Sequence, residues 1–313
     1  MTSPSLIVRP MTIEDVDAAD RAFRRGFGTF LGLPDPMQFG GDGQMVRYRF
    51  AAYPELAFVA ETEEGVVGTI QGRHWGATVG LGPISVQPEY WGKGVAQRLL
   101  DVFLKKAESL EPALTSLYTF SQSPTHVPLY QKYDFWPRLL TSLMTKPIDA
   151  SVDAPEARRF SETADDTDRA DFFAACRALT EGAFAGLVAD REIEAVRLQG
   201  AGETLLLVDK DGPEAMAVVH AGPGSESGTQ AAYVKFAVAR SADKVDGLLA
   251  ACERLGGEKG AKTMTAGVNL ACVETYQATR ARGFRAFTHG VAMHRFEHEG
   301  FDRRDTYVIH DER

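Results

Sequence analysis

Two glycines placed one residue apart, Gly92 and Gly94, stand immediately before an amphipathic segment in the stretch VQPEYWGKGVAQRLL, residues 86–100. A helix normally begins with Ser, Thr, Asp or Asn, whose side chain accepts hydrogen bonds from the free N–H groups of the first turn. Glycine offers no such acceptor, but it permits positive φ angles and close approach of a ligand to the main chain. Converging main-chain N–H groups at the positive end of a helix bind anions. The stretch therefore predicts an anion-binding loop.

This loop differs from the two common phosphate-binding motifs. The chain contains no G-x-x-x-x-G-K-[ST] motif, and Gln97 occupies the last glycine position of a G-x-G-x-x-G pattern. Neither a nucleotide triphosphatase nor a dinucleotide-binding domain is therefore predicted.

Hydrophobic periodicity predicts the elements that position the loop. Val95, Leu99, Phe103 and Ala107 recur at four-residue intervals and predict a helix with one buried face. The other elements expected in this half are a strand at 6–8, a helix from Thr12 towards Arg25, a Pro- and Gly-rich lid or acceptor-side loop at 33–43, a hairpin over 55–75, strands at 81–86, 114–120 and 139–146, and a short helix around 126–133.

The second half of the chain repeats this order of elements. Strands are expected at 233–239, 261–268 and 286–295, with helices at 245–255 and around Tyr276. A chain of 313 residues exceeds the usual size of one core, and 148–156 is polar with little periodicity. We therefore expect a domain at 1–147, a linker at 148–156 and a domain at 157–313. The second half has no glycine pair, and Ser241 is its expected helix cap.

Composition predicts a folded protein and argues against some classes of binding partner. Hydrophobic residues make up 44% and charged residues 25%, and the formal charge of −9 argues against nucleic-acid binding. The N-terminus is unlike a signal peptide and no apolar run reaches bilayer length, so we expect a cytoplasmic protein without a membrane partner. The three cysteines and seven histidines lack metal-ligand spacing, so neither disulfides nor a metal are expected. The sequence leaves a homodimer open.

The residues V-x-P-E-Y-W-G-K-G-V-A at 86–96 resemble the acyl-CoA loop of the GNAT superfamily of N-acyltransferases, whose motif is Q/R-x-x-G-x-G/A after a strand ending in V-x-P. Gly94 and Ala96 occupy the small-residue positions, whereas Trp91 replaces the usual Gln or Arg. SPTHVPLYQKYDF at 123–135 is similar to a second motif, N-x-x-A-x-x-x-Y-x-K-x-G-F. Tyr130, Lys132 and Phe135 match that motif, while Ser123, His126 and Asp134 depart from it.

The resemblance covers the first half, and in the second half only NLACVETYQATRARGF at 269–284 keeps a trace of it. It implies an α/β (α+β) fold of two tandem GNAT-like domains, each a mixed, mostly antiparallel sheet flanked by helices, with a degenerate second repeat. The implied activity is direct transfer of an acetyl group from acetyl-CoA to a primary amine of a small molecule or peptide. The implied cofactor-binding residues are Ile84, Ser85, Val86, Trp91, Gly92, Lys93, Gly94, Val95, Ala96 and Ser123.

Acyl transfer also needs an oxyanion donor, an acid and a base. The resemblance implies that a main-chain amide within 84–86 stabilises the oxyanion. We expect Tyr130 to return a proton to the departing thiolate, because a phenol with a pKa of about 10 is protonated at neutral pH. The alternative for Tyr130 is a packing role on the buried face of its helix.

The base is left open by the sequence. His126 has a suitable intrinsic pKa and stands one helical turn before Tyr130, although it can equally bond a neighbouring carbonyl. Glu89 would be repelled by a pyrophosphate and is expected to be solvated. His74 and Trp75 could line the acceptor pocket or simply pack, and a water molecule could relay the proton.

Two alternatives to this interpretation stay open. The acceptor site could lie between the two halves. The chain could also be a non-catalytic acyl-CoA-binding protein, a sensor or scaffold, in which the substitutions around Tyr130 abolish turnover.

Overall fold

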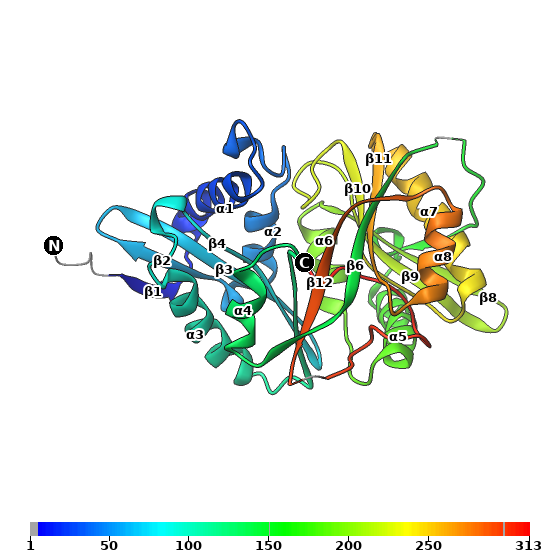
Figure 1. The fold of residues 1–313 in the computed structure, drawn as a ribbon. Helices are drawn as coiled ribbons and strands as arrows, with labels where there is room; N and C mark the ends of the chain where they lie inside the picture. The colour runs from blue at the N-terminus through cyan, green and yellow to red at the C-terminus, as the bar shows by residue number, and fades with distance from the viewer. Residues whose placement is uncertain (1–5, 150, 297) are drawn as a thin grey trace.

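In the computed structural model, which describes residues 6–149, 151–296 and 298–313, the strands form one continuous mixed sheet (Figure 1). Its order is β1-β2-β3-β4-β5-β12-β6-β11-β10-β9-β8-β7, and β13 pairs with β10 outside this path. The strands are β1 (Ile7–Pro10), β2 (Phe58–Thr62), β3 (Gly65–Trp75), β4 (Thr78–Val86), β5 (Leu114–Thr119), β6 (Phe135–Pro147), β7 (Arg158–Arg159), β8 (Gly202–Asp209), β9 (Gly212–His220), β10 (Ala231–Ala239), β11 (Thr263–Asn269), β12 (Arg285–Arg295) and β13 (Tyr307–Ile309).

Helices flank both halves of this sheet, and none in the described part of the chain is long and apolar enough to cross a membrane. They are α1 (Val16–Phe30), α2 (Met45–Ala52), α3 (Val95–Glu108), α4 (His126–Gln131), α5 (Asp166–Ala183), α6 (Asp190–Leu198), α7 (Ala242–Glu258) and α8 (Val273–Ala281). Only β4–β5 and β10–β11 pair in parallel; the other pairs in these residues are antiparallel. The predicted mixed, mostly antiparallel sheet is confirmed.

The first part of the sheet lies between α1 and α3, which cover opposite faces (Figure 1). On one face, the Ser85 hydroxyl of β4 donates to the carbonyl of Ala22 in α1 at 3.0 Å. On the other face, the ring of Phe103 in α3 lies directly over Gly72 of β3. A Cβ at Gly72 would come within 2.5 Å of that ring, so glycine permits this close packing.

Helix α3 follows the periodicity of its sequence. Val95, Leu99, Phe103 and Ala107 are all buried, which confirms the predicted apolar face. The helix carries Lys105 in its last turn, where a positive charge interacts favourably with the helix dipole.

The segment 33–43, expected as a loop, is held firmly against α1. Arg24 of α1 donates to the main-chain carbonyls of Phe39, Gly41 and Gly43 at 2.7–2.8 Å. The segment also contains a short 3₁₀ turn, Pro36–Gln38, and leads into α2, a helix that the periodicity did not predict.

The closing strand of each half lies in the sheet of the other half. β6, expected to close the first half, pairs along residues 141–147 with β11, and β12 pairs through Val291 to His294 with β5. β6 and β12 then pair with each other at the centre of the molecule. The sequence led us to expect each strand beside its own half, because periodicity identifies a strand but not its partner. The division at 147 and 157 therefore stays a proposal.

Buried polar groups join the two halves. Glu192 of α6 accepts hydrogen bonds from the hydroxyls of Tyr48 and Tyr53, both at 2.8 Å. Glu226, in the β9–β10 connection, pairs with Arg49 of α2 and with Lys235 of β10 at 2.7–2.8 Å. Buried charges are tolerated when they are paired in this way. The β9–β10 connection is thus a hairpin loop docked on the first half.

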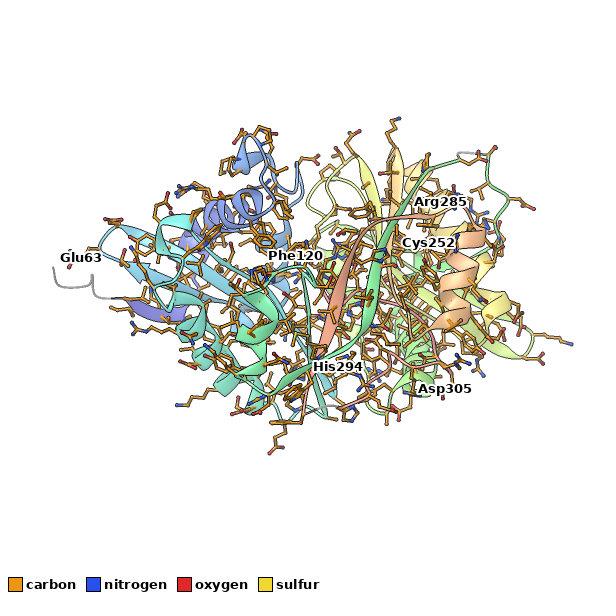
Figure 2. The ribbon with its side chains drawn as sticks, in the orientation of Figure 1. Glu63, Phe120, Cys252, Arg285, His294 and Asp305 are labelled. Carbon is orange, nitrogen blue, oxygen red and sulfur yellow. The ribbon has the colours of Figure 1, made fainter. Side chains whose placement is uncertain are left out.

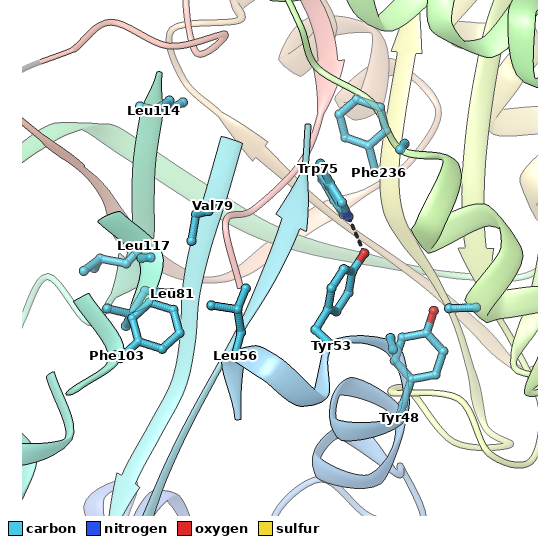
Figure 3. Close-up of a cluster of buried hydrophobic side chains, with 14 of the residues drawn as sticks. Tyr48, Tyr53, Leu56, Trp75, Val79, Leu81, Phe103, Leu114, Leu117 and Phe236 are labelled. Carbon is cyan, nitrogen blue, oxygen red and sulfur yellow. Dashed lines mark hydrogen bonds between the residues drawn. The ribbon is translucent and has the colours of Figure 1, made fainter. Parts of the chain in front are cut away.

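Trp75 lies in the apolar core that runs between the halves (Figure 3). It is fully buried, its Nε1 donates to the Tyr53 hydroxyl at 2.9 Å, and its ring meets Phe236 of β10 edge-on. His74 Nε2 lies 2.8 Å from the carbonyl of Gly76. Trp75 therefore has the packing role, whereas a place for His74 in the acceptor pocket stays a prediction. The three cysteines, Cys176, Cys252 and Cys272, are buried free thiols.

Candidate functional site

The glycine loop joins the end of β4 to the start of α3. Gly92 and Gly94 have φ angles of 73° and 78°, in the left-handed region that favours glycine. Gly94 is the N-cap residue of α3, and no side chain in the described structure caps this helix. The amides of Val95 and Ala96 therefore lie in a first turn without intrahelical or side-chain acceptors. This geometry can bind an anion through main-chain N–H groups.

The charges around the loop also favour an anion. The first turn of α3 holds no acidic residue, and Lys93 lies exposed with its Nζ 5.0 Å from the ring centroid of Tyr90. Glu89 accepts a hydrogen bond from Arg25 of α1 at 2.5 Å and is more than half exposed, as expected for a solvated carboxylate. Trp91, at the position of the usual Gln or Arg, donates from Nε1 to the carbonyl of Val86 at 2.7 Å. Trp91 therefore anchors the loop to β4.

A gap opens between β4 and β5 beside this loop. The two strands pair in parallel from Thr78↔Leu114 to Leu81↔Leu117, and in the described residues no ladder pair joins them further along. β4 nevertheless continues to Val86 and stays paired with β3 as far as Val86. Main-chain groups of 84–86 can thus face the gap without a β5 partner. The side chains of Ser85 and Val86 are buried, so a ligand in the gap could contact only the main-chain groups of these two residues.

Tyr130 and His126, both on α4, lie in different surroundings. Tyr130 is buried with its ring edge-on to Phe135, and burial raises the pKa of its hydroxyl, an effect that the Thr119 side chain opposes. His126 is half-buried against Phe30 of α1, with ring centroids 4.7 Å apart, and burial lowers its pKa. Tyr130 is therefore a protonated group and His126 a neutral one near pH 7.

Ser123 acts at the start of α4. Its hydroxyl accepts a hydrogen bond from the amide of His126 at 3.2 Å, while Thr125, the N-cap residue of α4, makes no side-chain cap bond. Ser123 thus fixes the helix that carries both candidate catalytic residues. Its contact with a cofactor stays a prediction.

Several residues near the gap gave no signal in the sequence. Arg49, which pairs with Glu226 of the second half, also donates to the carbonyl of Gly82 at 2.5 Å, where β4 and β5 part. Phe120, just after β5, packs with Phe30 and His126 and lies near the middle of the molecule (Figure 2). Arg49 lies on a helix and Phe120 follows a strand far along the chain, so no local sequence pattern indicates that both lie near the gap.

The corresponding place in the second half is closed. β10 and β11 pair in parallel from Ala231↔Thr263 to Val234↔Ala266, after which β13 pairs with Ala237 to Ala239 of β10. The gap beside β10 is therefore occupied by the chain itself. Ser241 is the N-cap residue of α7, as expected, but its hydroxyl donates to Asp243 at 2.6 Å instead of capping the helix.

Comparison with known proteins identifies one domain in the first half of the chain. Residues 54–137 match the acetyltransferase (GNAT) domain family, whereas a search of curated proteins finds no match. The crystal structure of a protein from Pyrococcus horikoshii, described as an acetyltransferase, is 16% identical to this chain with a TM-score of 0.70. The match covers 98% of this chain and 95% of that protein's chain. A GCN5-related N-acetyltransferase from Sphaerobacter thermophilus has 14% identity and a TM-score of 0.61, covering 93% and 95%.

A third structure is the GCN5-related glucosamine N-acetyltransferase region of a fungal multi-domain GH3 β-N-acetylglucosaminidase. It has 14% identity and a TM-score of 0.59, covering 94% of this chain and 38% of that one. At these identities the three structures establish the fold. Residues 54–137 are therefore a GNAT acetyltransferase domain, and over almost its whole length the chain has the fold of these GCN5-related structures, in agreement with the predicted GNAT-like fold.

Proposed function

We propose that the chain transfers an acetyl group directly from acetyl-CoA to a primary amine of a small molecule or peptide. One observation carries this proposal: the half that matches the family has both an uncapped glycine loop and an open gap between its parallel strands, whereas the other half has neither. A long anionic co-substrate fits such a site. Its anionic group can bind the main-chain donors of the loop, and the rest of the molecule can lie in the gap between the two strands.

The loop would bind the pyrophosphate of acetyl-CoA. Gly92, Lys93 and Gly94 bring main-chain groups and one positive charge to the start of α3, and the amides of Val95 and Ala96 complete the set. Trp91 holds the loop at the end of β4. Main-chain groups of Ile84, Ser85 and Val86 would then line the path of the thioester arm and stabilise the oxyanion.

Tyr130 and His126 would transfer the protons. Because its pKa is raised, Tyr130 keeps its proton near pH 7 and can give it to the departing thiolate. His126 has a lowered pKa, so its neutral ring can accept a proton from the ammonium group of the acceptor. Ser123 positions both residues through the start of α4.

The acceptor would enter on the α1 side of the gap. Phe27 and Phe30 of α1 pack there with Phe120, and all three rings are only half-buried. Aromatic faces attract cationic amines, and their apolar surface suits an acceptor with a hydrophobic group. Because Arg49 bonds Gly82 of β4 and also pairs with Glu226, the second half would help to shape this side.

The proposal is tested by measuring release of free CoA thiol with a panel of primary amines, aminoglycosides, amino acids and peptides. Turnover with any amine, together with formation of the N-acetyl product, supports the enzyme. Tight acetyl-CoA binding without turnover across the panel supports the non-catalytic alternative. The cytoplasmic location, the lack of a nucleic-acid partner and the homodimer stay predictions.

A further inference from the structure

A second group of chemistry-bearing side chains lies apart from the glycine loop. His294 of β12, Asp302 of the segment that follows, and Glu312 after β13 each offer one ligand atom, and these atoms lie within 4.8 Å of one another. The three side chains are at most 2% exposed. Figure 2 shows His294 on β12, close to where the two halves meet.

Hydrogen bonding fixes the state of the His294 ring. Its Nδ1 lies 2.7 Å from the carbonyl oxygen of His298, and a carbonyl can only accept, so Nδ1 carries the proton. In the neutral ring, Nε2 therefore presents its lone pair. This atom lies 3.4 Å from Oδ2 of Asp302.

The ligand atoms are also unsatisfied. His294 Nε2, Asp302 Oδ2 and Glu312 Oε1 have no hydrogen-bond partner within the part of the chain that the structure describes. Buried acceptors that face one another without a donor are costly, unless a cation lies between them.

Neighbouring residues hold the group in place. The second carboxylate oxygen of Glu312 accepts from Arg73 of β3 and from Ser116 of β5, the latter at 2.6 Å, which leaves Oε1 free. A Cβ on Gly300 would lie 2.8 Å from His294 Cε1, so glycine lets the segment fold closely around the ring. Such supporting bonds orient metal ligands.

We propose that His294, Asp302 and Glu312 bind one divalent transition-metal ion of the Zn²⁺ type. Imidazole nitrogen and carboxylate oxygen are usual zinc ligands, and the 3.4 Å between Nε2 and Oδ2 equals the edge of a tetrahedron with bonds of about 2.1 Å. Asp302 also lines a surface hollow together with Arg138, Leu270 and Arg303, so one of the three proposed ligands lies beside an opening to solvent.

The ion would have a structural role. Glu312 follows β13, the strand that closes the gap of the second half, so the metal fastens this segment to β12 and, through Ser116, to β5 of the first half. Histidine spacing led us to expect no metal, because the ligands come from a strand, a connection and a terminal segment, which show no regular spacing in sequence.

The test is titration of the full chain, stripped with a chelator, with Zn²⁺ alone in a calorimeter, followed by thermal unfolding. We expect one ion per chain and a higher Tm. Asp302→Asn and His294→Gln should each weaken Zn²⁺ binding by roughly a hundredfold or more, whereas Glu299→Gln, a matched change at an exposed acid of the same segment, should leave it unchanged.

A proton shared between His294 and Asp302 is the competing explanation, and Asp302→Asn separates the two. The amide of Asn can donate to Nε2, so the metal-free variant should fold and unfold at a Tm no lower than that of the unaltered chain. If the group is a metal site, Zn²⁺ should no longer bind to this variant or raise its Tm; if it only shares a proton, Zn²⁺ should have no effect on the unaltered chain either. Failure of the unaltered chain to take up one Zn²⁺, or equal uptake by the Asp302→Asn and Glu299→Gln variants, would overturn the proposal.

Discussion

Each half contains a pair of parallel strands with a helix after the first strand. The space between the two strands is open in one half and filled in the other. In the first half, β4 and β5 part after Leu81 and the next helix begins at Gly94 without a cap. In the second half, β10 and β11 part after Val234, and β13 fills the space beside β10. The same fold element is thus open in one half and closed by the chain in the other.

The first turns of the helices that follow these strands also differ, and the difference again favours anion binding in the first half. α3 has no acidic residue in its first turn, whereas α7 has Asp243 there. A carboxylate at a helix N-terminus satisfies the helix dipole and repels a phosphate. A parallel strand pair followed by a helix therefore does not by itself make an anion site; an uncapped glycine loop and an unfilled gap are also needed.

The largest effect is expected for Gly94→Glu. The substitution puts a negative side chain where the phosphates of acetyl-CoA should lie, so affinity should fall by roughly a hundredfold or more. Calorimetry with acetyl-CoA measures this. Gly260→Glu is the control, because Gly260 has a similar φ of 81° in open space after α7, so that variant has the same backbone strain far from the loop. Equal affinities for the two variants would contradict the assignment.

Tyr130→Phe should reduce kcat by about 10- to 100-fold, because it removes the proposed proton donor, while acetyl-CoA affinity stays the same. The measurements are steady-state rates with an active amine and a separate binding titration. Tyr133→Phe is the matched control, since the Tyr133 hydroxyl bonds Asp101 and the carbonyl of Gln97 in α3 and has no proposed part in proton transfer. If kcat is unchanged in Tyr130→Phe, the proton donor is another group.

Acid should weaken the contact between the halves. Burial alone would raise the pKa of Glu192, but the His220 side chain and the charge of Lys235 lower it to about 2. Because the folded pKa is below the unfolded value, Glu192 adds stability above about pH 4.5, and this stability is lost as the pH falls towards 2. Tm should therefore fall by several degrees over this range. Glu192→Gln should have a lower Tm at pH 7 and a flatter profile; parallel profiles would contradict this role.

The smallest effect is expected for Ser241→Asp in the second half. Aspartate is a good N-cap residue, so stability should change little. Since β13 closes this half, no cofactor should bind there. The acetyl-CoA affinity measured by calorimetry should therefore stay within about twofold of that of the unaltered chain, a change no larger than the loss of one exposed charge contact would cause. A large loss of affinity would mean that the second half binds the cofactor.

Local signals explain what the sequence predicted. Gly92, Gly94 and the apolar face of α3 are adjacent along the chain, so their types alone indicate a helix that begins without a cap. The positive φ angles of both glycines follow from the same local chemistry.

Long-range pairing explains what the sequence could not predict. The periodicity of β6 and β12 shows that they are strands but not that each joins the other half's sheet. β13 is only three residues long, so nothing in its sequence distinguishes it from a loop. His294 and Glu312 meet only because β13 brings the terminal segment to the centre of the molecule.

The most direct test of the account is a crystal structure of the chain with bound CoA. We predict one CoA per chain, with its pyrophosphate on the amides of residues 92–96 and its thiol arm between β4 and β5, while β13 stays paired with β10. A pyrophosphate beside Ser241, or a CoA that displaces β13, would contradict the account.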